Sequence, residues 1–169
     1  RKVLAAVKRA KTLNLNIISG TIRRSQKDYM ETRRRVLNGE IGDIVGANVI
    51  QNGGALWHRS RKPGWTDMEY MLRNWANFCW LSGDLLTEVF VHEIDVMLWY
   101  FGQRPTKATA WGGRQRGVTG DVYDFFSIEY LFENGVRGHC ASRLIDGCTN
   151  EKVEQINCTR GYADAAGKL

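Results

Sequence analysis

The stretch VYDFFSIEYLFENGVRGHCASRLI, residues 122–145, decides how the chain folds. It contains two runs rich in β-branched and aromatic residues, 122–132 and 136–145, separated by the three residues ENG. Asn-Gly between two such runs is the strongest short-range signal for a β-hairpin. The stretch therefore predicts two antiparallel neighbouring strands.

The first of these strands carries apolar side chains on both faces. Alternation places Phe126, Ile128 and Tyr130 on one face, and Phe125 and Leu131 on the other. A sheet with two apolar faces needs cover on both sides. Helices are expected to cover one of them.

The rest of the chain supplies further strands and three helices. Strands are predicted at 43–51, 106–113 and 152–159, and helices at 2–13, about 25–38 and about 84–101. The second helix is expected to turn Tyr29, Met30, Val36 and Leu37 inward. The fold class is therefore α+β, with an open, mainly antiparallel sheet flanked by helices.

Residues 15–20, LNIISG, are predicted to form a short strand after the first helix. A helix followed by a strand is one unit of a parallel sheet, and a single unit cannot bury itself. Residues 1–20 are therefore expected to be the tail of a preceding domain. Residues 21–169 are expected to form one α+β domain.

Composition narrows the function classes. The net charge is +6, with arginines clustered at 23–24 and 33–35, which is typical of a solvated face, and no nucleic-acid-binding motif occurs. No apolar run approaches the roughly 20 residues of a membrane span. The four cysteines form no CxxC pair, so no metal site is expected.

The predicted helix at 84–101 has a narrow polar stripe. At 100° per residue, Glu88, His92, Asp95 and Trp99 fall within an arc of about 60°, and only Glu93 breaks the otherwise apolar remainder. Such a helix is buried, so its stripe faces a cleft or another polar element. The stripe is either a functional site, a buried network in which Glu88 pairs with His92, or an exposed face.

The connection 52–83 is long and holds four of the six tryptophans. Loops of this length in compact domains are commonly functional. Trp57 and Trp75 are suited to stack on an apolar face of a ligand, whereas packing within the loop is the structural alternative. Asn74, Asp84 and Arg114 are candidates to bind hydroxyl groups of a ligand, and the family resemblance described next implies that this ligand is a sugar.

The sequence resembles the second half of the Gfo/Idh/MocA oxidoreductases, the glucose-fructose oxidoreductase and inositol dehydrogenase-like family. The resemblance covers nearly the whole chain, through GTIRRSQKDY (20–29), NGEIGDIVGANV (38–49), NWANFCWLSGD (74–84), VHEIDVMLWYFGQRPTKATAWGGRQ (91–115), YDFFSIEYLFENGVR (123–137) and GYADA (161–165). It implies that residues 1–20 end a Rossmann domain. It also implies that the C-terminal domain normally continues beyond residue 169.

The resemblance implies an acid/base role for His92 in an NAD- or NADP-dependent oxidation of a sugar, polyol or cyclic alcohol. Glu88 stands where the family has Asp, and Asp95 matches a supporting acidic position. Thr21, Arg23 and Arg24 are expected near the cofactor. The G-x-G-x-x-G turn and the Glu-Lys-Pro motif of the family are absent from the chain.

The resemblance also implies a dimer or tetramer, in which a partner subunit covers the open face of the sheet. The protein is expected to be cytoplasmic, although some relatives carry export signals. Two alternatives remain: a non-catalytic assembly module without cofactor binding, and a glycoside hydrolase that uses NAD transiently.

Overall fold

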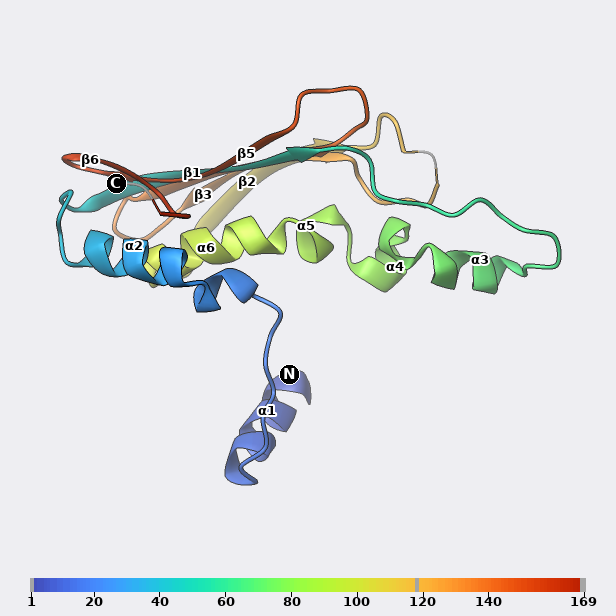
Figure 1. Ribbon diagram of the computed structural model, residues 1–169, viewed down its shortest axis with the longest axis horizontal. Helices are drawn as coiled ribbons and strands as arrows, with labels where there is room; N and C mark the ends of the chain where they lie inside the picture. Colours follow the sequence, from blue (N-terminus) through green and yellow to red (C-terminus); the bar gives the residue numbers. More distant parts are fainter. Residues whose placement is uncertain (1, 118, 168–169) are drawn as a thin grey trace.

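A computed structural model describes residues 2–117 and 119–167. The chain forms a six-stranded sheet with helices beneath one face (Figure 1). The strands are β1 (Ile44–Gly53), β2 (Lys107–Gly113), β3 (Phe125–Leu131), β4 (Arg137–Leu144), β5 (Glu151–Cys158) and β6 (Gly161–Asp164). The helices are α1 (Lys2–Thr12), α2 (Lys27–Leu37), α3 (Asp67–Arg73), α4 (Cys79–Ser82), α5 (Leu85–Glu88) and α6 (Val91–Phe101), with 3-10 turns η1 (Ile22–Ser25) and η2 (Trp75–Asn77).

The strand order is β2-β3-β4-β1-β5-β6. β1 pairs with β4 in parallel, and every other neighbouring pair is antiparallel. This arrangement confirms the predicted α+β class with an open, mainly antiparallel sheet. β6 is a short additional strand that the apolar pattern does not predict.

The hairpin between β3 and β4 forms as predicted. Gly135 adopts φ +82°, and the amide of Phe132 donates to the carbonyl of Val136 over 3.0 Å. The register places Ile128 opposite Cys140, and both side chains are buried on the helix-covered face. The turn therefore sets which side chains of both strands enter the core.

The core lies between α6 and the centre of the sheet. Val96, Met97 and Tyr100 of α6 are at most 1% exposed and pack against inward residues of the strands. Gly138 of β4 permits this approach, because a Cβ there would lie 2.1 Å from Met97 Sδ. The helix therefore rests directly on the backbone of β4.

Helix α2 covers the edge of the same face through a narrower stripe than predicted. Tyr29, Thr32 and Val36 are buried, whereas Met30 and Leu37 are 51% and 49% exposed. The inward prediction is confirmed for Tyr29 and Val36 and is wrong for Met30 and Leu37. Spacings of three and four residues put only one line of α2 against the sheet, because the helix lies at its margin.

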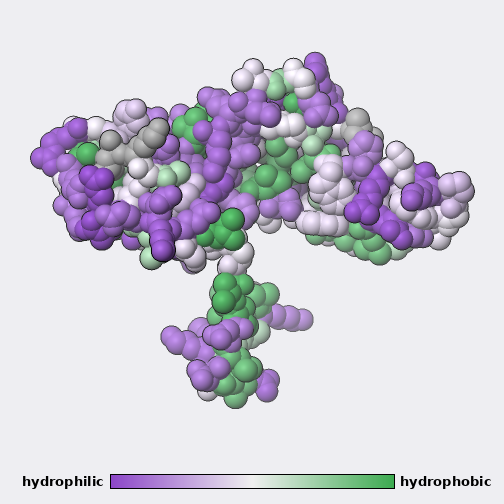
Figure 2. Space-filling view, viewed as in Figure 1, coloured by the Kyte–Doolittle hydropathy of each residue, from purple (hydrophilic) through white to green (hydrophobic). Residues whose placement is uncertain are grey.

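Helix α1 lies apart from the two layers (Figure 1). Its surface and the segment after it are largely apolar and open (Figure 2), with Val3 74% and Ile18 90% exposed. The predicted strand at 15–20 does not form. A strand requires a neighbour for its backbone hydrogen bonds, and none lies beside this segment in the described structure.

Candidate functional site

The predicted helix at 84–101 is two helices. α5 ends at Glu88, α6 begins at Val91, and the turn between them buries Phe90 completely. Asp84 starts α5 with its Oδ1 accepting from the Leu85 amide over 2.6 Å. The break means that the angular position of Glu88 does not carry over to α6. No hydrogen bond joins Glu88 to His92 in the described structure, so the predicted Glu88–His92 network does not form.

His92 lies in the first turn of α6 and is half-buried. Its Nδ1 atom is buried and meets no hydrogen-bond partner among the described residues. A buried polar atom without a partner is uncommon and invites an explanation by a ligand, a water molecule or a catalytic role. His92 is therefore the residue at this end of α6 that is best suited to bind a ligand or transfer a proton.

Glu93, next to His92, is the deepest charged residue of α6 at 1% exposure. Its Oε1 accepts from Arg23 Nη2 over 2.6 Å, and Arg23 Nε lies 3.0 Å from Glu154 Oε1 on β5. Glu154 also accepts from the Tyr29 hydroxyl and lies 3.2 Å from Lys152 Nζ. This buried ion cluster of Arg23, Glu93 and Glu154 joins η1, α6 and the sheet.

Burial raises the pKa of Glu93, although the neighbouring Arg23 opposes that shift and Glu154 adds to it. Burial and the hydrogen bond to Glu154 also raise the pKa of Tyr29. The cluster therefore holds one guanidinium between two carboxylates in surroundings that disfavour charge.

Asp95 and Trp99, further along α6, contact arginines of η1 and α2. Arg24 forms a two-pronged pair with Asp95, with Nε and Nη2 2.8 Å and 2.7 Å from the carboxylate oxygens. Its guanidinium also lies 5.8 Å from the ring centre of Trp99, which Arg33 covers at 5.0 Å. Asp95 and Trp99 thus anchor η1 and α2, which leaves Glu88 and His92 as the site candidates of the predicted stripe.

The residues predicted to lie near a cofactor differ in how much of each side chain a ligand can reach. The side chain of Arg23 is 12% exposed and enclosed by the ion cluster, whereas that of Arg24 is 43% exposed. Thr21 is half-buried, and its hydroxyl does not cap η1. Arg24 and Thr21 therefore retain groups that a ligand can reach, and Arg23 does not.

Several predicted substrate residues prove to be structural. Asn74 is fully buried, and its amide bonds the backbone of Arg59 and Tyr70. The carboxylate of Asp84 receives the amides of Leu85 and Tyr123. Both side chains hold the long connection in place: the backbone occupies the amide of Asn74, and at Asp84 two backbone amides occupy Oδ1 while the Cys79 thiol contacts Oδ2 at 3.5 Å.

The remaining predicted substrate residues are exposed. Trp57 and Trp75 are 46% and 41% exposed, and Arg59 lies 5.6 Å from the ring centre of Trp57. Arg114 donates to the carbonyl of Gly117 over 3.0 Å. No interaction in the described structure links Trp57, Trp75 or Arg114 to His92, so the structure does not gather the predicted residues into one pocket.

A family comparison identifies the architecture. The sequence profile of the GFO/IDH/MocA C-terminal domain matches residues 29–164. The chain belongs to this family. The matched range contains both the helix with His92 and the six-stranded sheet. A comparison with curated proteins found no match.

Solved structures share the fold of this GFO/IDH/MocA domain. They include myo-inositol 2-dehydrogenase from Lactobacillus plantarum (TM-score 0.65, 18% identity, 89% of this chain and 42% of that one). They also include GenD2 from gentamicin A biosynthesis in complex with NAD (0.69, 18%, 90% and 40%). A third is the super-repressor mutant of Gal80p from Saccharomyces cerevisiae (0.68, 18%, 92% and 42%). The chain spans less than half the length of these proteins, and at such identities the likeness shows the fold alone.

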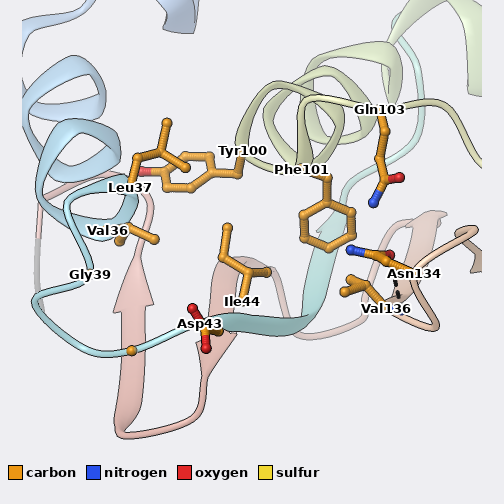
Figure 3. A pocket seen from close by; sticks show the side chains of 11 residues that line it. Val36, Leu37, Gly39, Asp43, Ile44, Tyr100, Phe101, Gln103, Asn134 and Val136 are labelled. Carbon is orange, nitrogen blue, oxygen red and sulfur yellow. Dashed lines mark hydrogen bonds between the residues drawn. The ribbon is translucent and has the colours of Figure 1, made fainter.

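The GFO/IDH/MocA domain contains a cavity of about 320 Å³ at the other end of α6 from His92 (Figure 3). Leu37, Ile44, Tyr100 and Phe101 line it, with Asn134 at one side. At 1.5 Å per residue, Tyr100 lies about 12 Å along the helix from His92. This cavity is therefore separate from the predicted catalytic end.

The sequence did not identify Glu93 and Glu154 as members of a buried ion cluster. Each is a lone carboxylate on an inward face: Glu93 interrupts the apolar part of α6, and Glu154 alternates with Ile156 and Cys158 on β5. Two isolated charges on faces otherwise destined for the core are the signal of a buried ion pair. What the sequence does not supply is the identity of the partner, Arg23.

Among residues 2–117 and 119–167, no three His, Cys, Asp or Glu side chains are grouped as a metal site would require. Within the same residues, no helix combines the length and apolar character of a membrane span. The four cysteines are free thiols. Burial and the nearby Asp84 raise the pKa of Cys79 to about 11, so this thiol stays protonated at neutral pH.

Proposed function

We propose that this domain forms the substrate side of an NAD(P)-dependent oxidoreductase that acts on a secondary alcohol of a sugar, polyol or cyclic alcohol. The observation that supports it is His92, which lies in the first turn of α6 with a buried Nδ1 that no described residue binds. Its membership in the GFO/IDH/MocA family supports the reaction class.

The proposed role of His92 is proton transfer. Oxidation of an alcohol requires a base that takes the hydroxyl proton, and imidazole is suited to this role near neutral pH. Glu88 ends α5 four residues earlier and is half-buried. We propose electrostatic support of the protonated imidazole as its role, which a carboxylate can supply without a direct hydrogen bond.

The residues of this chain do not fit the pyrophosphate of a dinucleotide. No G-x-G-x-x-G turn occurs in the sequence, and no described helix begins after such a turn. NAD or NADP supplies hydride acceptance in the complete reaction. The proposal therefore gives this chain only substrate positioning and proton transfer, with Thr21 and Arg24 as the groups best placed to meet a cofactor held elsewhere.

Substitution of His92 tests the catalytic proposal. In a protein that joins this chain to a dinucleotide-binding domain, His92→Ala should lower kcat about 10²- to 10⁴-fold with a much smaller change in KM, because a general base acts in the transition state. Glu88→Gln should have a smaller effect. The assay follows NAD(P)H formation over a panel of inositols and sugar alcohols, with Met30→Ala, at an exposed position of α2, as the control. Unchanged turnover in His92→Ala would remove the assignment.

A non-catalytic assembly module is the second candidate. The fold also occurs in the Gal80p super-repressor mutant, and a shared fold does not fix function. Stable complex formation without alcohol-dependent reduction of NAD or NADP would favour this candidate.

The open face of the sheet supports the proposal of a homo-oligomer. Ile50, Ser127, Ala141 and Val153 lie on it across four adjacent strands and are only half-buried. Trp111 on β2 is 63% exposed on the same face. Ile50, Ala141 and Val153 are paired across β4, β1 and β5 and form an apolar strip on this otherwise mixed face, and such a strip is a candidate protein interface. A second copy of the chain is the proposed cover.

Residues 1–20 are proposed to belong to a neighbouring domain. Apolar side chains of α1 and of the following segment are exposed, including Leu4 at 67% and Ile17 at 58%. Burial of this surface needs a partner layer that the described residues do not provide.

A further inference from the structure

A second cavity lies where the long connection folds back on itself, beyond α5 from His92. Its volume is about 540 Å³, within the range of small-molecule sites. α3, α4 and the segment 119–121 surround it, at the far end of the helical layer (Figure 1). Its lining combines aromatic rings with carboxylates and one guanidinium: Arg61, Asp67, Tyr70, Phe78, Trp80 and Asp121.

One wall of this cavity is held firmly by the protein itself. Arg61 donates to Asp67 over 2.7 Å and lies 4.7 Å from the ring centre of Tyr70. The Tyr70 hydroxyl is 2.5 Å from that of Thr119. Gly120 brings this segment against η2, since a Cβ there would lie 1.7 Å from the Asn77 carbonyl oxygen. The wall is therefore arranged before any ligand arrives.

Two further lining residues, Trp80 and Asp121, have groups that can contact a ligand. Trp80 is 59% exposed, and no cation or second ring covers it in the described structure. Trp57 and Trp65 of the same connection differ, because Arg59 covers the first and Arg73 the second. Asp121 uses Oδ1 to accept from the Cys79 amide over 2.7 Å, and its other oxygen bonds none of the described residues. An exposed indole and a carboxylate oxygen without a hydrogen bond thus line the same cavity.

The charge of the cavity selects the kind of ligand. Asp67 neutralises Arg61, and Asp121 adds a negative charge. Phosphates and other anions are therefore disfavoured. Exposed indole faces take up apolar C–H surfaces, and carboxylates accept strong hydrogen bonds from hydroxyl groups. A neutral ring that has one apolar face and several hydroxyls matches both.

We infer that this cavity binds a pyranose ring of a carbohydrate, stacked on Trp80 with hydroxyls donating to Asp121. The site is separate from His92, and the inference does not depend on the proposed oxidation. It requires neither cofactor nor turnover.

Saccharide binding to the full chain tests the inference. The probes are glucose, cellobiose and maltose at millimolar concentrations, followed by saturation-transfer NMR and calorimetry. At least one should bind, and Trp80→Ala should weaken its affinity about tenfold or more, which is the scale of a lost stacking contact. Asp121→Asn keeps the oxygen that accepts from Cys79 but removes the charge, and it should weaken binding severalfold. Met30→Ala, at a 51% exposed position of α2 away from this cavity, is the control and should bind like the wild type.

Three results would overturn the inference. The first is an absence of binding by all three saccharides. The second is equal affinity in the wild type and in a folded Trp80→Ala variant, with folding checked by circular dichroism. The third is preferential binding of adenosine monophosphate, which would show a nucleotide site. Retention of part of the affinity in Trp80→Phe would support the stacking role.

Discussion

At Glu93, a carboxylate that is 1% exposed pairs with the guanidinium of Arg23, which also contacts the carboxylate of Glu154. Arg23 is the only arginine that contacts both carboxylates in the described structure. Both carboxylates are buried and have lost their hydration, so the folded state depends on the pairing with Arg23 to offset that cost in free energy. The residue next to His92 is thereby anchored to both η1 and the sheet, which restricts how the first turn of α6 can move.

Replacement of Arg23 should be strongly destabilising. Arg23→Met leaves two buried carboxylates facing each other, and loss of one partner of a buried ion pair typically costs about 3–5 kcal/mol in the free energy of unfolding. Urea unfolding followed by circular dichroism measures it. Arg34→Met, which removes an exposed pair with Glu31, is the control and should shift the midpoint very little. Equal effects of the two substitutions would contradict the importance of the cluster.

Glu93 should also make stability depend on pH. Its pKa is raised in the folded state, so the folded state binds the proton more tightly than the unfolded state. Its contribution is then fully present below the ordinary carboxyl pKa of about 4.3 and is lost as pH rises through the raised value. The difference in unfolding free energy between wild type and Glu93→Gln should therefore shift in favour of the wild type as pH falls. Urea titrations across this range measure it, and the opposite slope would show that Arg23 outweighs burial.

At the scale of the element, the turn between α5 and α6 sets the geometry of the end of α6 that carries His92. Phe90 is fully buried in this turn and interrupts the helical path after Glu88. The apolar pattern predicts the helical segments correctly but not the break, because a buried Phe fits a continuous helix and a turn equally well. A continuous helix at 100° per residue would place Glu88 and His92 on one side, whereas in the structure they belong to two different helices, α5 and α6.

The contact between α6 and β4 should be sensitive to a single methyl group. Gly138→Ala places a Cβ about where Met97 Sδ lies, and overpacking of this kind costs about 1–3 kcal/mol. Chemical denaturation measures the change. Gly20→Ala is the matched control, since nothing lies within 4 Å of a Cβ there. In a Met97→Ala background the cost of Gly138→Ala should shrink, and an undiminished cost would show that the strain arises elsewhere.

At the scale of the whole molecule, the sheet is covered by helices on one face and open on the other (Figure 1). The open face mixes apolar side chains with a Glu129–His139 pair at 2.5 Å between Oε1 and Nδ1. A monomer would leave this face in water. The proposed oligomer would remove it from solvent.

A charge on the open face should therefore weaken self-association. Ile50→Glu places a carboxylate among half-buried apolar neighbours and should shift the protein toward the monomer in sedimentation-velocity experiments. Leu72→Glu, at a 52% exposed position on α3, is the control and should leave the distribution unchanged. A wild-type chain that sediments as a monomer at all concentrations would exclude the sheet-mediated oligomer for this chain.

The sequence by itself determined the hairpin, the strands from β1 to β5 and the α+β class, because alternation, turn residues and helical spacing are local signals. It did not determine which charged groups meet. Arg23, Glu93 and Glu154 are separated by 70 and 61 positions along the chain, and only folding brings them within ion-pair distance. The same holds for Asn74 and Asp84, whose side chains look available in the sequence but are occupied by backbone amides and carbonyls once the long connection folds. Burial and partner choice depend on packing across the whole domain, and this is why the tertiary structure alone decided which predicted site residues remain free.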